Sequence, residues 1–190
     1  MRGQQVIDSA SWKSALLELF GGAWTFAAAG PRNHDDWRRD VQAVMKLQVK
    51  DPRNWSSLNF PPPGSGGERN QETPFVDLRL DEFDSLLYRA GKKSASQLLV
   101  ALQGKYYQSS NIPDFENRKE RLFQCADTVI SRFSPEIAYY TNLAAARVDP
   151  DVELLNPDAE WNCLSNFLSD CGLIVVSESE VGVFWAFDED

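Results

Sequence analysis

The chain has 190 residues and a mass of 21.4 kDa, and 43% of its residues are hydrophobic and 12% aromatic. This apolar content is enough for one buried core, so we expect a single folded domain over residues 1–190 and exclude a disordered chain. The formal net charge of -9 argues against nucleic acid as a general partner, because phosphate binding needs clustered Lys and Arg.

The N-terminal segment and the hydropathy of the chain bear on its location. Residues 1–8 are polar, and the first apolar segment is interrupted by Lys13 and Glu18, which is unlike a signal peptide. No run approaches the roughly 18 apolar residues that a membrane span needs. We therefore expect a soluble cytoplasmic protein.

The first half of the chain alternates helical and extended patterns. Asp8 or Ser9 can cap a first helix that ends at Gly21. Helical spacing with acids in the first turn predicts a second helix at 35–47, where the acids suit the helix dipole. Alternation of apolar residues predicts three short strands, at 23–29, 55–60 and 75–80.

The second half begins with three predicted helices. Asp81 can cap the first, which stops at Gly91, the second starts at Ser94, and the third runs from Pro113 to Pro135. Residues 137–148 are apolar without a decisive period, and the run Tyr139-Tyr140-Thr141 only slightly favours a strand over a helix. The final segment predicts a helix at 158–170, a stop at Gly172, and a hairpin of strands at 173–177 and 181–187.

These patterns predict an α+β fold, with a mixed or antiparallel sheet, packed helices and a C-terminal β-hairpin. Residues 61–73 contain prolines and glycines and predict a flexible loop. The strand at 181–187 is apolar on both faces, since Trp185 and Phe187 share one face and Phe184 and Ala186 the other. Such a strand is either central in a covered sheet or covered by another chain.

Motifs for cofactor or metal chemistry are weak. His34 is the only histidine, so no second imidazole completes a zinc site, and we interpret it as a polar residue at a helix start. No serine lies in a Gly-x-Ser-x-Gly elbow, and the glycine-rich run at 64–67 lacks the Lys-Ser/Thr ending of a phosphate loop. The odd count of three cysteines argues for reduced, structural thiols. We expect no cofactor, no metal and no enzyme activity.

Charge is distributed very unevenly along the chain. Eleven of the 28 acidic residues lie from Asp149 onward and none of the 19 basic residues does, so 17 acids and 19 bases precede them. Two interpretations of these acids are equally open. They form either a solvated surface or a surface that binds a basic protein, to which exposed aromatic residues add affinity. The predicted partner-binding residues are Asp149, Asp151, Glu153, Glu178, Glu180, Trp185, Phe187, Asp188 and Glu189.

Two segments carry a resemblance to a known family. They are Phe133-Ser-Pro-Glu-Ile-Ala-Tyr-Tyr140 and Glu160-Trp-Asn-Cys-Leu-Ser-Asn-Phe-Leu168. With the compact acidic α+β character, they resemble the immunity proteins of bacterial polymorphic and type VI secreted toxins. The similarity is to the second half of the family numbered fifty-two, whose Gly-Trp pair appears here as Glu160-Trp161. The resemblance implies a protein that binds a cognate toxin domain and blocks its active site.

The leading hypothesis is therefore a non-enzymatic immunity or antitoxin-type protein that neutralises a secreted toxin domain. An alternative is an acidic adaptor or secretion chaperone that holds a partner segment by strand addition to the hairpin edge. A third hypothesis is a carboxylate-based hydrolase, which needs a cleft with two close acids of raised pKa.

Overall fold

The computed structural model describes residues 7–22, 24–59, 73–135, 138–158 and 160–188. The described helices are α1 (Ser9–Phe20), α2 (Trp37–Met45), α3 (Glu82–Leu86), α4 (Lys92–Ala101) and α5 (Phe115–Ser131), with short 3-10 turns η1 (Lys105–Tyr107), η2 (Ser109–Asn111) and η3 (Ala144–Arg147). The strands are β1 (Thr25–Pro31), β2 (Tyr88–Ala90), β3 (Ala138–Thr141), β4 (Ser169–Val176) and β5 (Glu180–Asp188). The loop predicted at 61–73 lies outside the described residues except for Thr73.

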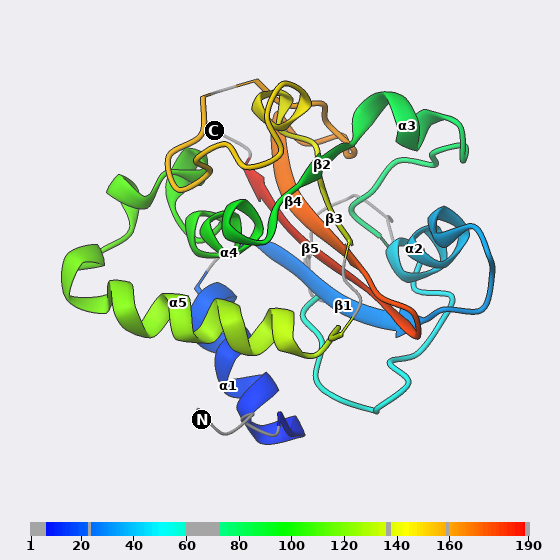
Figure 1. The fold of residues 1–190 in the computed structure, drawn as a ribbon, viewed down its shortest axis with the longest axis horizontal. Coiled ribbons are helices and arrows are strands. Elements are labelled where there is room, and N and C mark those ends of the chain that lie inside the picture. Colours follow the sequence, from blue (N-terminus) through cyan, green and yellow to red (C-terminus); the bar gives the residue numbers. More distant parts are fainter. Residues whose placement is uncertain (1–6, 23, 60–72, 136–137, 159, 189–190) are drawn as a thin grey trace, which may run out of the picture.

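The five strands form one sheet in the order β1-β5-β4-β3-β2 (Figure 1). Every neighbouring pair is antiparallel, so the predicted α+β class is confirmed with an antiparallel sheet and a C-terminal β4–β5 hairpin. The last strand, β5, lies between β4 and the first strand, β1. Strand β5 is paired on both sides, and β4 is paired with β3 over Leu173–Val176, so the hairpin is internal to the sheet and does not offer the edge expected for strand addition there.

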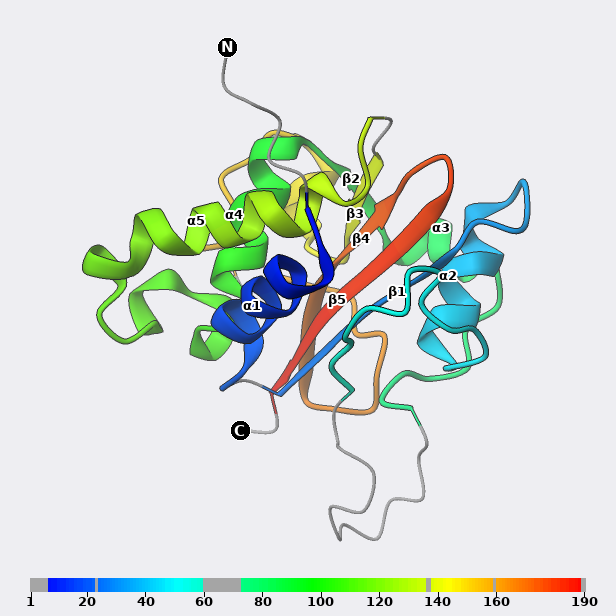
Figure 2. The same cartoon turned by 90° about the horizontal axis from the view of Figure 1, so that it is seen from below.

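Helices cover both faces of this sheet, as Figures 1 and 2 show from two directions. Helices α1, α4 and α5 pack on one face, and α2, α3 and the segment around Phe75 pack on the other. Strand β5 contributes Phe184 to the first core and Trp185 to the second, and both side chains are 0% exposed. The strand apolar on both faces is therefore central in a covered sheet.

Local capping explains where the first two helices begin. Asp8 and Ser11 form a reciprocal cap on α1, because each backbone N–H donates to the other's side chain, at 3.0 and 2.8 Å. Asp36 caps α2 by accepting a hydrogen bond from the Arg38 backbone N–H at 3.1 Å. The sequence predictions of both helices are confirmed within two residues at each end.

The helix predicted at 158–170 is absent from the described structure, and strand β4 already begins at Ser169. The buried carboxylate of Asp170 accepts hydrogen bonds from the backbone N–H groups of Leu164 and Ser165 at 2.8–3.0 Å. These bonds fold the preceding residues into a loop around Asp170. Gly172 is not a helix stop but lies within β4, opposite Trp185.

Other short elements differ from the sequence prediction as well. Residue 60 lies outside the described residues, and the described parts of the strands predicted at 55–60 and 75–80 form only isolated bridges, Ala27 with Leu58 and Phe75 with Ser165. The ambiguous segment at 137–148 divides into β3 and η3. Cys163, exposed, and Cys171, buried in β4, are both free. In the described part of the chain no helix is both long and apolar enough to cross a bilayer.

Candidate functional site

The predicted partner-binding residues do not form one surface, because the β4–β5 hairpin separates them. Asp188 ends β5 at one end of the sheet, opposite Ser169, whereas Glu178 lies in the turn at the other end. A strand of this length spans roughly 25 Å at about 3.3 Å per residue. Figure 1 shows the turn at the lower right and the C-terminal end at the upper left. Glu189 lies outside the described residues.

Trp185 and Phe187 are core residues, so the expectation that they form an exposed binding surface is wrong. Trp185 is 0% exposed and its indole Nε1 donates to Asp170 Oδ1 at 2.8 Å. Phe187 is 6% exposed and packs against Phe75 and Phe167, with ring centroids 5.6 and 5.0 Å apart. Both point into the layer beneath α2 because β5 is a central strand.

Glu180 is also buried, contrary to the expectation of an exposed acid in the hairpin turn. Its Oε1 accepts from Arg132 Nη2 at 2.6 Å, and Arg132 makes a bidentate pair with Asp51 at 2.7 and 2.8 Å. The Arg132 guanidinium lies 4.6 Å from the Trp12 ring centroid and 5.0 Å from that of Trp55. Glu180 thus belongs to an internal ion cluster that fastens the hairpin to α5.

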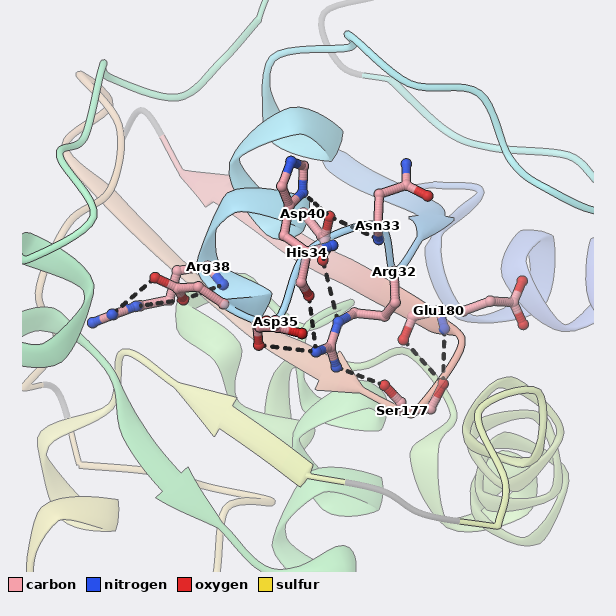
Figure 3. A network of polar contacts seen from close by, with 9 residues as sticks. Arg32, Asn33, His34, Asp35, Arg38, Asp40, Ser177 and Glu180 are labelled. Carbon is pink, nitrogen blue, oxygen red and sulfur yellow. Dashed lines mark hydrogen bonds and ion pairs between the residues drawn. The ribbon is translucent and has the colours of Figure 1, made fainter.

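A second polar network holds the hairpin turn from the α2 side (Figure 3). Asp40 is 2% exposed and accepts from Arg32 Nε at 3.2 Å and the Asn33 backbone N–H at 3.1 Å. Arg32 also donates through Nη1 to the Ser177 carbonyl at 2.8 Å. With the Glu180 cluster on the other side, this network makes the turn a rigid part of the fold.

His34 lies at the start of α2 and its Nδ1 is 2.7 Å from Asp40 Oδ1. The ring is half exposed, and in the described part of the chain no hydroxyl or thiol hydrogen-bonds to it. It therefore has an orienting carboxylate but no adjacent nucleophile. Among the described residues no three His, Cys, Asp or Glu side chains are grouped closely enough to hold a metal ion.

The remaining predicted acids lie on one ordered segment, residues 148–160, which we call the acidic strap; residue 159 is not described. Hydrogen bonds to its backbone carbonyls fix it along α4, η2 and η3. Donor and acceptor are Gly91 N and Pro150 O (2.7 Å), Ser94 Oγ and Val152 O (2.6 Å), Ser109 N and Leu155 O (3.1 Å), Gln108 Nε2 and Pro157 O (2.6 Å), and Ala144 N and Glu160 O (2.8 Å). The strap has no regular secondary structure, but hydrogen bonds to its carbonyls order its backbone.

The strap turns apolar residues inward and carboxylates outward. Leu154 is 0% exposed and Pro157 is buried. The exposed acids are Asp149, Asp151, Glu153, Asp158 and Glu160, and within the described residues none of them forms an ion pair. By contrast, carboxylates elsewhere such as Asp40, Asp51 and Asp77 each have a basic partner. Among the described residues, exposed acids without an ion pair also lie on α5, such as Glu116 and Glu120, but α5 carries basic residues as well, whereas the strap contains no Lys or Arg.

Two exposed apolar side chains lie at the same end of the molecule as the acidic strap. Val148, at the start of the strap, is 90% exposed, and Leu168 is 74% exposed. Leu168 is adjacent in the chain to Ser169, whose Oγ is 3.0 Å from the hydroxyl of Tyr107 beside the strap. Sequence analysis selected neither residue for binding, and Leu168 lies in the segment predicted as a helix at 158–170, which does not form.

No protein family, curated protein or solved structure matches this chain. The two segments that carry the sequence resemblance have different roles in the fold. Phe133, in the first segment, is a core residue beyond the end of α5, and the second segment is the loop around Asp170. The function is therefore inferred from the geometry of the chain.

Proposed function

We propose that this chain is a non-enzymatic, immunity-type inhibitor that binds a basic toxin domain through the acidic strap. The observation that supports this function is the set of five exposed carboxylates without basic partners on a hydrogen-bonded backbone. Unpaired charge of one sign attracts a partner of the other sign and accelerates their encounter.

The rigidity of the strap favours binding as well. Because its carbonyls already accept hydrogen bonds from Gly91, Ser94 and Ser109, little backbone entropy is lost when a partner docks. The apolar side chains of Val148 and Leu168 at this end supply area that can be desolvated, which charge alone does not provide. The strap thus combines long-range attraction with a local contact.

The proposed surface differs from the one predicted from sequence. It keeps Asp149, Asp151 and Glu153, together with Asp188 at the same end of the sheet, and adds Asp158 and Glu160. Glu178 is exposed but lies at the opposite end, so it serves as a matched control.

The test is a charge reversal of Asp151, Glu153 and Asp158 to Lys, compared with Glu178→Lys. Each variant is used as bait for the lysate and secreted fraction of the native host, and binding of any recovered basic folded domain is then measured against salt. We expect the triple variant to slow association by at least tenfold and to flatten its salt dependence, while Glu178→Lys changes neither. Equal association rates for wild type and the triple variant would overturn the proposal.

A further inference from the structure

The outer edge of β1 is only partly closed. Ala27 and Leu58 exchange two backbone hydrogen bonds, each 2.8 Å long. Because peptide groups alternate in direction along a strand, the N–H and C=O of Ala29 point to the same outer side as those of Ala27. Within the described residues, no group hydrogen-bonds to Ala29 on that side.

The gap beside Ala29 has a clear cause. Continuing the Ala27–Leu58 register would place Ser56 opposite Ala29. Instead the Ser56 carbonyl accepts a hydrogen bond from Trp12 Nε1 at 2.8 Å, which draws this part of the chain toward α1. Ala29 is only 4% exposed, yet its outward N–H and C=O groups have no neighbouring strand to pair with.

A pocket of about 360 Å³ occupies this gap. It is bounded by the β1 edge, the end of α2 and the chain that follows, with the residues Ala29, Leu47, Val49, Lys50, Asn54 and Trp55 among its lining. The volume is in the range that accommodates small ligands and single side chains. The pocket is apolar on the Leu47 and Val49 side and polar where Lys50 and Asn54 lie.

Two of the lining residues have a backbone conformation that L-amino acids rarely adopt. Leu47 and Asn54 both have φ of 55°, which Asn tolerates and which is unfavourable for Leu. Leu47 follows the C-cap residue of α2, where the Leu47 N–H donates to the Val44 carbonyl at 3.0 Å and the Gln48 N–H donates to the Ala43 carbonyl at 2.9 Å, so its positive φ is that of a common helix ending. Glycine usually occupies this position of a helix ending, so the 44% exposed side chain of Leu47 stands beside the pocket at a cost in backbone energy.

We infer that this pocket binds an extended peptide segment of a partner protein, which pairs with Ala29 and inserts an apolar side chain between Leu47 and Trp55. A peptide is favoured over other ligands because Ala29 offers one donor and one acceptor at the spacing of a β-bridge. Pro31 has no N–H and Leu58 already pairs with Ala27, so the open edge accepts a short segment only. The site lies toward the hairpin turn, since Ala29 pairs with Gly182, and is independent of the strap.

The experiment starts from a phage-displayed library of random nine-residue peptides selected on the full chain. Enriched peptides are then synthesised with a single N-methyl group at each amide in turn, and affinity is measured by fluorescence anisotropy. Methylation of the amide that donates to the Ala29 carbonyl should weaken binding at least tenfold, whereas methylation of the next amide, which points away from β1, should not.

Protein variants give an independent readout. Leu47→Gly should weaken binding at least tenfold while leaving the melting temperature unchanged or higher, because glycine relieves the strained φ. Leu168→Gly, at an exposed leucine outside the pocket, and the strap charge-reversal variant should bind the peptides as wild type does. No enriched peptide, equal effects at alternating amides, or unchanged affinity of Leu47→Gly would each overturn the inference.

Discussion

Arg132 shows how strongly single residues are constrained in this fold. Its side chain is 0% exposed, and its charge is balanced by Glu180 and Asp51. Removing one member of a buried ion pair leaves an uncompensated charge, which costs more than the pair itself contributes. We therefore expect Glu180→Ala to lower the free energy of unfolding by about 3 kcal/mol in urea titrations.

The neighbouring acid in the same turn is the control for this experiment. Glu178 is exposed and, among the described residues, takes no part in either polar network around the turn, so Glu178→Ala should change stability by less than about 0.5 kcal/mol. Similar losses for both variants would show that the turn, and not the buried charge, determines the effect.

Asp170 should make stability depend on pH. Burial raises the pKa of its carboxyl above the ordinary value, although Ser165, Leu164 and Trp185 donate hydrogen bonds that oppose the shift. A carboxyl with a raised pKa binds more protons in the folded than in the unfolded state, so its contribution to stability is lost as pH rises through the folded pKa. The unfolded value near 3.8 sets the lower limit of that window.

The comparison that isolates this contribution is wild type against Asp170→Asn. The difference in unfolding free energy, wild type minus variant, should be largest at low pH and should decrease above pH 3.8 until Asp170 is fully ionised. Equilibrium unfolding at a series of pH values measures it. A difference that instead grows with pH would show that the hydrogen bonds outweigh burial.

Residues with local partners could be predicted from sequence, and residues with distant partners could not. Asp36 was expected in the first turn of a helix because acids there suit the helix dipole, and the Arg38 N–H that it caps is only two positions away. Nothing near Glu180 in the sequence indicates Arg132, which is 48 positions away. The same limit applies to Trp185, because its burial depends on which strands flank β5.

At the scale of elements, Gly172 shows how one residue type can indicate two structures. A glycine after an apolar periodic stretch is typical of a helix end. Here it lies in β4, where an added Cβ would be 2.2 Å from Trp185 Cε3. Only glycine leaves room for the indole ring at this position. The stretch before it was read as a helix because its apolar spacing is helical, but hydrogen bonds to the Asp170 carboxylate select a loop.

This close approach gives a prediction for the central strands. Gly172→Ala should lower the unfolding free energy by about 1–3 kcal/mol, because the ring of Trp185 must move within a packed layer. Thermal unfolding followed by tryptophan fluorescence measures both the loss and the displaced indole. Gly22→Ala, where an added Cβ would meet nothing within 4 Å, is the control and should leave that signal unchanged.

At the scale of the whole molecule, charge was the more reliable sequence signal. All five acids of the strap are exposed, as expected because charged side chains are rarely buried without partners, whereas Asp170 and Glu180, outside the strap, are buried with partners. Apolar residues gave the opposite result, since a continuous apolar strand does not reveal what covers it. The two proposed sites lie toward opposite ends of the sheet, so one partner can occupy the strap while another occupies the β1 edge.

The central position of β5 has a consequence for biosynthesis. Strands β1 and β4 belong to one sheet only because β5 lies between them. Contacts between residues far apart in the sequence must therefore form before either hydrophobic core is complete. On the ribosome, β1 therefore emerges long before its partner. We expect the nascent chain to rely on chaperones during that interval, and to acquire protease resistance only after Asp188 has left the exit tunnel.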